Sequence, residues 1–142
     1  MIDFDAVTRL AQEAGLAIME VYERSGNINV EIKGDESPLT EADLAANDVI
    51  SKGLTSIAPD IPIVSEEGNV GDPRDTPYCW LVDPLDGTKE FIKRNGMFTV
   101  NIALMRRKGT RWDPVFGVVH APATNTTWRG GTTVPAERTG PD

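Results

Sequence analysis

Residues 80–91 read WLVDPLDGTKEF, an apolar segment that runs into two aspartates and then a glycine. Residues 79–82 are all apolar, which is typical of a buried strand. Proline cannot donate to a strand ladder, so we expect this strand to stop at Asp83 and to leave that carboxylate at its carboxyl end. We expect Leu85 to lie in a tight turn before Asp86, with its side chain inward and its carbonyl directed towards the space between the two acids.

The oxygens of this turn suit a hard cation, since Mg²⁺ binds carboxylate and carbonyl oxygens at about 2.0–2.1 Å. The glycine in Gly87-Thr88 permits a close approach of the backbone. Residues 89–92 are expected to begin a helix, whose free N–H groups bind phosphate. The same pattern is also ordinary turn chemistry, in which Asp and Gly serve capping and a positive φ. Spacing alone therefore leaves a metal site and a plain turn open.

Residues 80–104 closely resemble the first signature of the inositol monophosphatase superfamily, which consists of lithium-sensitive, Mg²⁺-dependent phosphomonoesterases. Within it, Lys89-Glu90-Phe91 resembles the CysQ branch, the 3'(2'),5'-bisphosphate nucleotidases, whereas inositol phosphatases tend to have Asn before the Phe. The resemblance covers residues 3–129, and the family's chain continues well beyond residue 142. It implies the N-terminal half of the inositol monophosphatase/sugar phosphatase fold, an α/β arrangement in which helices pack in layers on a largely antiparallel sheet.

Two further acidic motifs resemble elements of this family. Thr40 to Asp43 match its Thr-x-x-Asp element, whose Asp helps to orient the attacking water through the Thr of the Asp-Gly-Thr turn, here Thr88. Glu66 and Glu67 match its Glu-Glu-Gly element, in which the first Glu is a metal ligand and the second holds a water beside the metal. Structural explanations stay open, because an early acid favours a helix dipole and paired acids at a strand end are typical of a solvated turn.

The N-terminal third is expected to contain two helices and a strand. Apolar residues recur at three- and four-residue steps over residues 4–24, which predicts an amphipathic helix. Residues 27–33 alternate as a half-buried strand does. Thr40 and Asp43 resemble a capping box, which predicts a second helix that closes at Ala58-Pro59.

Further strands are predicted on either side of the central turn. Residues 61–65 form a short apolar strand that ends at the two glutamates, and residues 69–77 read as a connecting loop. Alternation over residues 98–105 and a returning strand over 115–121 predict an antiparallel hairpin. The basic residues 106–111 are expected to form its solvated turn.

The remaining features indicate structure rather than chemistry. His120, the only histidine, lies in a strand pattern and is expected to be a half-buried structural residue. Apolar periodicity is lost from Gly130 on, so residues 130–142 are predicted to be a disordered or aberrant tail after a metal- and phosphate-binding part over residues 1–129.

Composition narrows the class of protein. Lys and Arg number 14 against 22 acids, and the net charge of −8 argues against binding to nucleic acid or to anionic membranes. The single cysteine, Cys79, excludes an internal disulfide and fits a reducing compartment. No apolar run approaches the roughly 20 residues of a membrane span. We expect a cytoplasmic protein, with peripheral association with the inner membrane as the alternative that the resemblance adds, and make no prediction of its oligomeric state.

The resemblance implies a Mg²⁺-dependent phosphomonoesterase that converts 3'-phosphoadenosine 5'-phosphate to AMP and phosphate in sulfur assimilation. The implied catalytic residues are Asp43, Glu67 and Thr88. The implied metal ligands are Glu66, Asp83, Leu85 through its carbonyl, and Asp86. The implied substrate-binding residues are Glu66, Leu85, Asp86, Gly87, Thr88 and Lys89.

Two alternatives remain: an inositol or sugar-phosphate phosphatase, and an inactive truncated fragment that binds a cation or phosphate. The family's second metal depends on a further carboxylate, in a Trp-Asp element of the C-terminal half that is followed by small residues and Gly. The only Trp-Asp here, Trp112-Asp113, is followed by Pro114 and does not match. We therefore expect this chain to be impaired as a catalyst.

Overall fold

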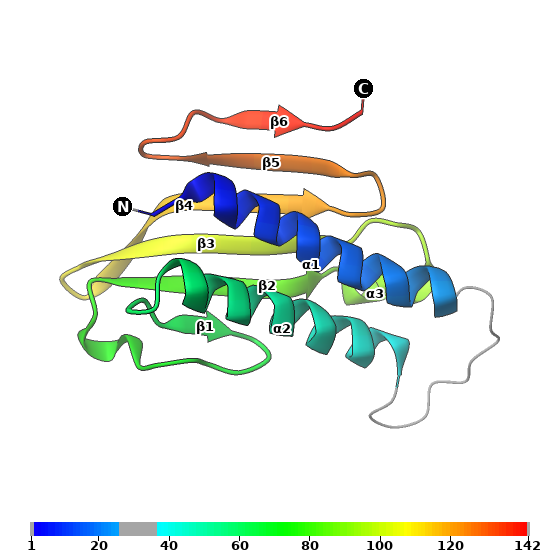
Figure 1. Ribbon diagram of the computed structural model, residues 1–142, viewed down its shortest axis with the longest axis horizontal. Helices are drawn as coiled ribbons and strands as arrows, with labels where there is room; N and C mark the ends of the chain where they lie inside the picture. Colours follow the sequence, from blue (N-terminus) through cyan, green and yellow to red (C-terminus); the bar gives the residue numbers. More distant parts are fainter. Residues whose placement is uncertain (1, 26–36, 142) are drawn as a thin grey trace.

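The computed structural model describes residues 2–25 and 37–141. Figure 1 shows how its helices and strands follow one another along the chain. Their bounds are α1 (Phe4–Ser25), α2 (Pro38–Ile57), β1 (Ile63–Ser65), the 3₁₀ turn η2 (Pro73–Asp75), β2 (Tyr78–Asp86), α3 (Thr88–Lys93), β3 (Thr99–Lys108), β4 (Arg111–Ala121), β5 (Thr126–Gly131) and β6 (Glu137–Thr139). The strand predicted over residues 27–33 lies outside the described residues.

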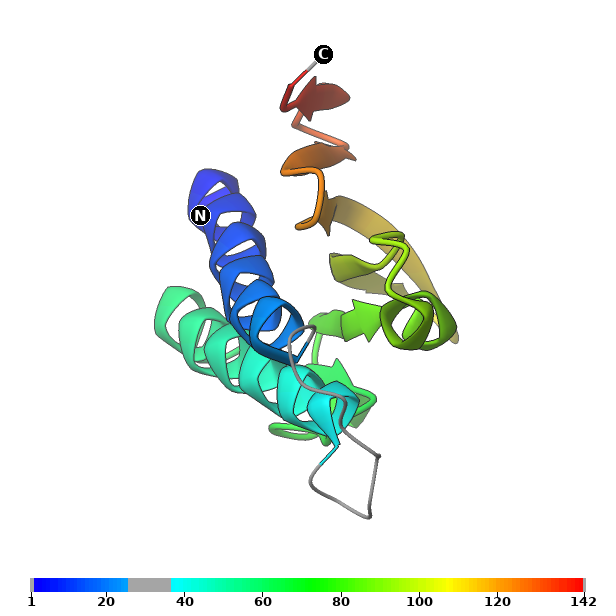
Figure 2. The same ribbon diagram turned by 90° about the vertical axis from the view of Figure 1, so that its right-hand side faces the viewer.

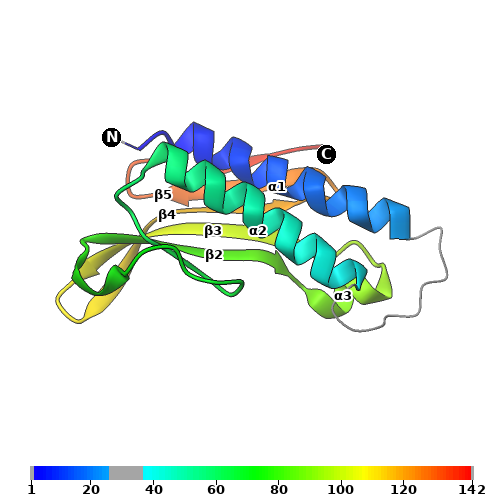
Figure 3. The same cartoon turned by 60° about the horizontal axis from the view of Figure 1, so that its bottom comes forward.

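The strands form one six-stranded sheet in the order in which they occur in the chain. β1 runs parallel to β2, and every later neighbour is antiparallel. α1 and α2 lie side by side on one face of this sheet, as Figures 2 and 3 show. The short helix α3 lies at the end of β2 (Figure 1). The predicted layered α/β fold with a largely antiparallel sheet is confirmed.

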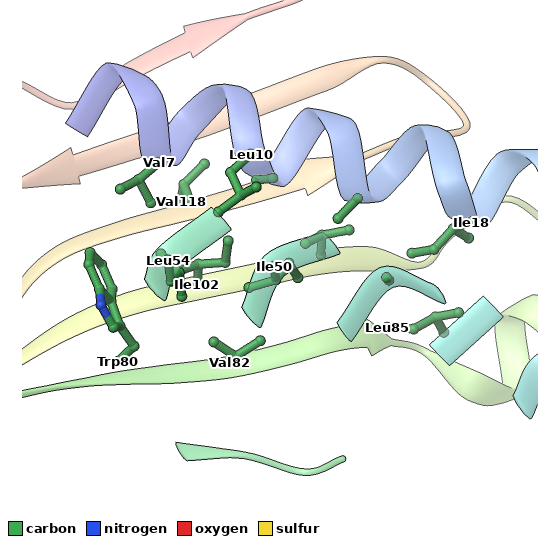
Figure 4. Packing of buried hydrophobic residues seen from close by; sticks show 14 of the residues in the cluster. Val7, Leu10, Ile18, Ile50, Leu54, Trp80, Val82, Leu85, Ile102 and Val118 are labelled. Carbon is green, nitrogen blue, oxygen red and sulfur yellow. The ribbon is translucent and has the colours of Figure 1, made fainter. Parts of the chain in front are cut away.

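The core lies between the two long helices and the sheet (Figure 4). α1 buries residues at three- and four-residue steps, which confirms its predicted amphipathic character, and α2 buries one residue every four from Ala42 to Leu54. The sheet contributes alternate residues of its central strands: Trp80, Val82, Val100, Ile102, Leu104, Phe116 and Val118. Burial of each large apolar side chain stabilises the fold by about 1.5–3 kcal/mol, which holds the helices to this face. In the described residues no helix is long and apolar enough to cross a membrane.

β2 does not stop at Asp83 as predicted but continues to Asp86. The strand pairing passes from Asp83 to Asp86 on β2 while β3 advances by only two residues, so β2 contains a bulge. A bulge tolerates Pro84, because the extra residue is not part of the ladder. Leu85 turns its side chain into the core, where it is 2% exposed, as predicted.

α2 begins earlier than the predicted capping box. Ser37 is its N-cap, and the Ser37 Oγ accepts a hydrogen bond from the Thr40 N–H at 3.1 Å. Pro38 follows at the first helical position, where its missing N–H costs nothing. Asp43 is therefore not needed to cap the helix.

The β3–β4 hairpin is confirmed but is longer than predicted. β3 reaches Lys108 and β4 begins at Arg111, so the basic segment lies mainly in strands and the turn is only residues 109–110. The Arg107 guanidinium lies 4.4 Å from the centre of the Trp112 ring. Such cation–π stacking favours the extended hairpin over a solvated basic loop.

The chain after Gly130 differs from the predicted irregular tail. β5 continues to Gly131, and β6 pairs with it in antiparallel register. Arg129 stabilises this end, because it forms ion pairs with Asp5 of α1 at 2.6 Å and with Glu137 of β6 at 3.2 Å. β6 is an edge strand of exposed residues, so its pairing relies on backbone hydrogen bonds rather than on apolar periodicity. A division of the chain at residue 129 stays a prediction.

Candidate metal and phosphate site

Two strand ends bring the first acids together. In the parallel pair of β1 and β2, Ser65 lies opposite Val82, so Glu66 and Asp83 follow at the same end of neighbouring strands. Glu66 and Asp83 therefore lie at neighbouring strand ends. Glu66 and Glu67 are the central residues of a turn closed by the Gly68 N–H, which donates to the Ser65 carbonyl at 3.1 Å.

Asp43 lies on α2, close enough to Glu66, Glu67 and Asp83 for their charges to affect its pKa. Burial raises the pKa of Asp43 to about 7, and the negative charges of Glu67, Asp83 and Glu66 contribute to this rise. The side chain is half-buried. A carboxyl with a pKa near neutrality is suited to exchange protons with water, a property common in active sites.

The pKa of Asp83 is also raised. Burial raises the pKa of Asp83 to about 6, and the charges of Glu66 and Asp86 raise it further, while the Leu85 N–H donates a hydrogen bond that lowers it. The Asp83 Oδ1 atom is buried and has no hydrogen-bond partner among the described residues. A buried carboxylate oxygen without a partner is costly, so a ligand at this atom would be stabilising.

The charges around these two carboxyls are of one sign. In the described part of the chain, the charged side chains that shift the pKa values of Asp43 and Asp83 are all acidic. Oxygen donors concentrated without a basic partner fit a hard cation such as Mg²⁺. As the described side chains stand, no three acids converge into a closed ligand cluster.

The turn after the bulge brings backbone N–H groups to the same end of β2. Gly87 has φ +98°, and a Cβ there would lie 3.0 Å from the Met97 carbonyl oxygen and 3.2 Å from the Phe98 Cα. The position therefore requires glycine for both its conformation and its close approach. Thr88 opens α3, and the side chains of Thr88 and Lys89 are exposed. No hydrogen bond joins Asp43 to Thr88 within the described residues, so their predicted pairing stays a prediction.

Two polar residues of β4 have roles apart from this site. Asp113 lies near the start of β4 and forms ion pairs with Arg111 and Lys108. Its strand partner Arg106 in turn lies opposite Tyr78, so Asp113 is at the other end of β2 from the candidate site. His120 is buried and its Nδ1 lies 2.8 Å from the Thr127 Oγ1, a structural role as expected.

Asn47 and Ser65 were not singled out by the sequence, although both contact the turn that carries the two glutamates. One signal was available for Ser65, since alternation in β1 places it on the same buried face as Ile63. One was available for Asn47, which lies one helical turn after Asp43.

The comparisons with known proteins agree with one another. A model of the inositol monophosphatase family matches residues 3–140. The 3'(2'),5'-bisphosphate nucleotidase CysQ of Shigella flexneri is 53% identical over 123 residues, which are 85% of this chain and 48% of that protein. The CysQ of Escherichia coli strain K12 is 51% identical with the same coverage.

Solved structures show the same relationship. The crystal structure of CysQ from Bacteroides thetaiotaomicron matches with a TM-score of 0.76 and 36% identity, over 96% of this chain and 48% of that chain. SuhB from Bartonella henselae matches with a TM-score of 0.77 and 26% identity, over 96% of this chain and 51% of that one. The chain spans about half the length of these relatives. Since the family model accounts for nearly all of its residues, the chain belongs to the inositol monophosphatase family.

Proposed function

We propose that this chain carries the metal- and phosphate-binding part of a Mg²⁺-dependent phosphomonoesterase that converts 3'-phosphoadenosine 5'-phosphate to AMP and phosphate. The observation that carries the proposal is the Asp83 carboxylate, which has a buried, unpartnered oxygen among the described residues and only acidic charges around it. Relatives at 51–53% identity are 3'(2'),5'-bisphosphate nucleotidases, which supports the choice of substrate. We place the reaction in the sulfur metabolism of the cytoplasm.

The carboxylates of Glu66, Asp83 and Asp86 and the carbonyl of Leu85 would hold the cations. Bound divalent cations in such sites neutralise charge on the phosphate and make water more acidic. The backbone N–H groups of Gly87 and Thr88 would donate to the phosphate oxygens, because the Gly87 conformation exposes the start of α3.

We assign the transfer of a proton from the attacking water to side chains of this chain. Asp43 would accept a proton from the attacking water at its carboxylate, which is half-buried on α2 near Glu67, Asp83 and Glu66. The Thr88 hydroxyl would orient that water towards Asp43. Glu67 would hold it by a further hydrogen bond from the neighbouring turn.

Lys89 is the residue on which substrate choice is expected to depend. Its side chain is exposed beside the proposed phosphate-binding turn, where an ammonium can contact a second phosphate group. The alternative, an inositol or sugar-phosphate phosphatase, would need no charge for a second phosphate.

A substrate panel separates the two functions. This chain would be fused to the downstream half of the Escherichia coli relative and assayed with Mg²⁺ for phosphate release from 3'-phosphoadenosine 5'-phosphate and inositol 1-phosphate. We expect the bisphosphate to be preferred, and Lys89→Ala to reduce kcat/KM for it by about tenfold more than for the monophosphate. Lys93→Ala, which removes an exposed charge from the last turn of α3, is the matched control. Equal losses on both substrates would contradict the proposed role of Lys89, and a preference for inositol phosphate would contradict the assigned substrate.

A further inference from the structure

Ser65 is a buried polar residue at the end of β1, with 8% of its surface exposed. Its hydroxyl donates to the Asn47 Oδ1 at 2.7 Å and accepts the Glu67 N–H at 3.2 Å. Its own N–H donates to the Asn69 Oδ1 at 3.2 Å, and its carbonyl accepts the Gly68 N–H at 3.1 Å. Every polar group of Ser65 is therefore used, and one hydroxyl joins α2 to the turn that follows β1.

Backbone pairing holds the base of this turn, since β1 is paired with β2 up to Ser65. Ile63 and Val70 close it by exchanging two backbone hydrogen bonds of 2.8 and 2.9 Å. The side chains of Glu66 and Glu67 are exposed and, in the described part of the chain, form no hydrogen bond or ion pair. In the described residues, the Ser65–Asn47 hydrogen bond is the side-chain bond that joins this turn directly to α2.

Asn47 connects this contact to the acidic site. It lies four residues after Asp43 on α2, and residues four apart project from the same side of a helix. The helix face that presents Asp43 therefore also anchors Ser65. A movement of the turn away from α2 would separate Glu66 and Glu67 from Asp43.

We propose that Asn47 and Ser65 are positioning residues that fix the Glu66–Glu67 turn against the face of α2 that carries Asp43. The inference rests on the proposed function, since it is the assignment of Glu66 as a metal ligand that makes the turn's position matter. Residues that orient metal ligands typically affect metal affinity by 10–100-fold. We expect loss of the Asn47–Ser65 hydrogen bond to weaken cation binding by about tenfold.

The experiment uses Mn²⁺ alone as the probe, with free Mn²⁺ measured by electron paramagnetic resonance. The variants are Asn47→Ala, Ser65→Ala and the double variant. Ser56→Ala removes an exposed hydroxyl from the same helix and is the matched control. Asn47→Ala is expected to keep the fold, because its side chain is only half-buried and alanine favours helix. Amide exchange of Glu67 in metal-free protein is the second measurement.

We expect Asn47→Ala to bind Mn²⁺ about tenfold more weakly and Ser65→Ala to bind it at least as weakly, because Ser65→Ala also removes the acceptor of the Glu67 N–H. The double variant should bind no more weakly than Ser65→Ala, since the hydrogen bond between the two residues is already lost in that variant. The Glu67 amide should exchange faster in both single variants than in the Ser56 control. Unchanged affinity in both variants, or multiplicative losses in the double variant, would overturn the proposal.

Failure of the proposed function has a different signature. If the unmodified chain binds no Mn²⁺, the metal assignment is wrong, and Glu67 exchange alone then decides whether Asn47 and Ser65 position the turn. Unchanged Glu67 exchange in Asn47→Ala would overturn the positioning role, and faster exchange would support it.

Discussion

Asp83 is the residue on which the assignment of a cation site depends most. Its Oδ1 atom is buried without a hydrogen-bond partner in the described residues, and Glu66 and Asp86 add negative charge around it. An asparagine has nearly the same shape but provides a neutral oxygen, so the substitution tests charge more than packing.

We expect Asp83→Asn to weaken the binding of Mg²⁺ or Mn²⁺ at least tenfold, because a charged ligand of a hard cation is lost. Isothermal titration calorimetry of both cations measures this directly. Asp60→Asn removes an exposed charge from the loop after α2 and is the control for net charge alone. Equal binding by wild type and Asp83→Asn would reject Asp83 as a ligand.

Asp43 gives a prediction on pH. Its pKa in the folded chain, about 7, is above the ordinary value of 3.8, so the folded state holds the proton more strongly than the unfolded state. Its contribution to stability is therefore fully present below about pH 4 and is lost as the pH rises through 7. In EDTA, Asp43→Asn should match wild type at pH 4 and be more stable by roughly 1–2 kcal/mol at pH 8, after allowance for solvent screening. Urea unfolding at both values checks this, and a difference independent of pH would contradict it.

Single residues differed in how far the sequence predicted them. The inward side chain of Leu85 was predicted from the tight turn before Asp86, and the strand ends that carry Glu66 and Asp83 were predicted from apolar runs, which are local features of the sequence. The roles of Asn47 and Ser65 depend on a contact between residues 18 apart, which no local pattern specifies.

At the scale of elements, the turn between β2 and α3 is the one whose backbone is most constrained. Gly87 has φ +98° and approaches the backbone of residues 97–98, whereas Gly109 has φ +65° and a Cβ there would meet no atom within 4 Å. Substitution of Gly109 therefore measures the cost of a left-handed conformation alone. Substitution of Gly87 adds the cost of a close approach to the backbone.

We expect Gly87→Ala to destabilise the chain by about 2–3 kcal/mol, and Gly109→Ala by about 1 kcal/mol. The larger effect arises because the new methyl group meets backbone atoms that cannot turn aside. Urea unfolding of both variants measures the difference. Similar losses would show that φ alone accounts for the glycine at position 87.

Helices α1 and α2, strands β1 to β4 and the hairpin were all predicted in kind, because each shows a 3.6- or 2-residue periodicity or a short apolar run. Their boundaries were less predictable. β2 passes through Pro84 by means of a bulge, and bulges depend on the register of the partner strand. β6 escaped prediction because an exposed edge strand shows no apolar alternation.

At the scale of the whole molecule, the sheet has one covered face and one open face. In the described residues, both long helices lie on the same side (Figure 2). The other side has a groove of about 530 Å³ lined by Leu81, Ala103, Gly117 and Val119, among others, and it extends to Glu66 and Asp83. Leu81 is 42% exposed there. An open apolar surface beside a candidate site favours association with further polypeptide.

The open face also bears on the catalytic competence of the chain. The chain spans about half the length of its relatives. Asp113, the acid of its one Trp-Asp sequence, lies away from the candidate site and forms ion pairs with Lys108 and Arg111. A reaction that needs two cations requires ligands for both, so residues 1–142 alone should turn over 3'-phosphoadenosine 5'-phosphate at least about 100-fold more slowly than the fusion to the downstream half of the Escherichia coli relative.

Two measurements on each protein check this: phosphate release with Mg²⁺, and sedimentation velocity, in which the shorter chain should self-associate through the open face and the fusion should not. A third sample, the fusion with Asp83→Asn, shows that any turnover depends on the site described above. Comparable turnover by the short chain and the fusion would contradict the prediction. It would mean that another residue of residues 1–142, or a second copy of the chain docked on the open face, supplies the remaining ligand.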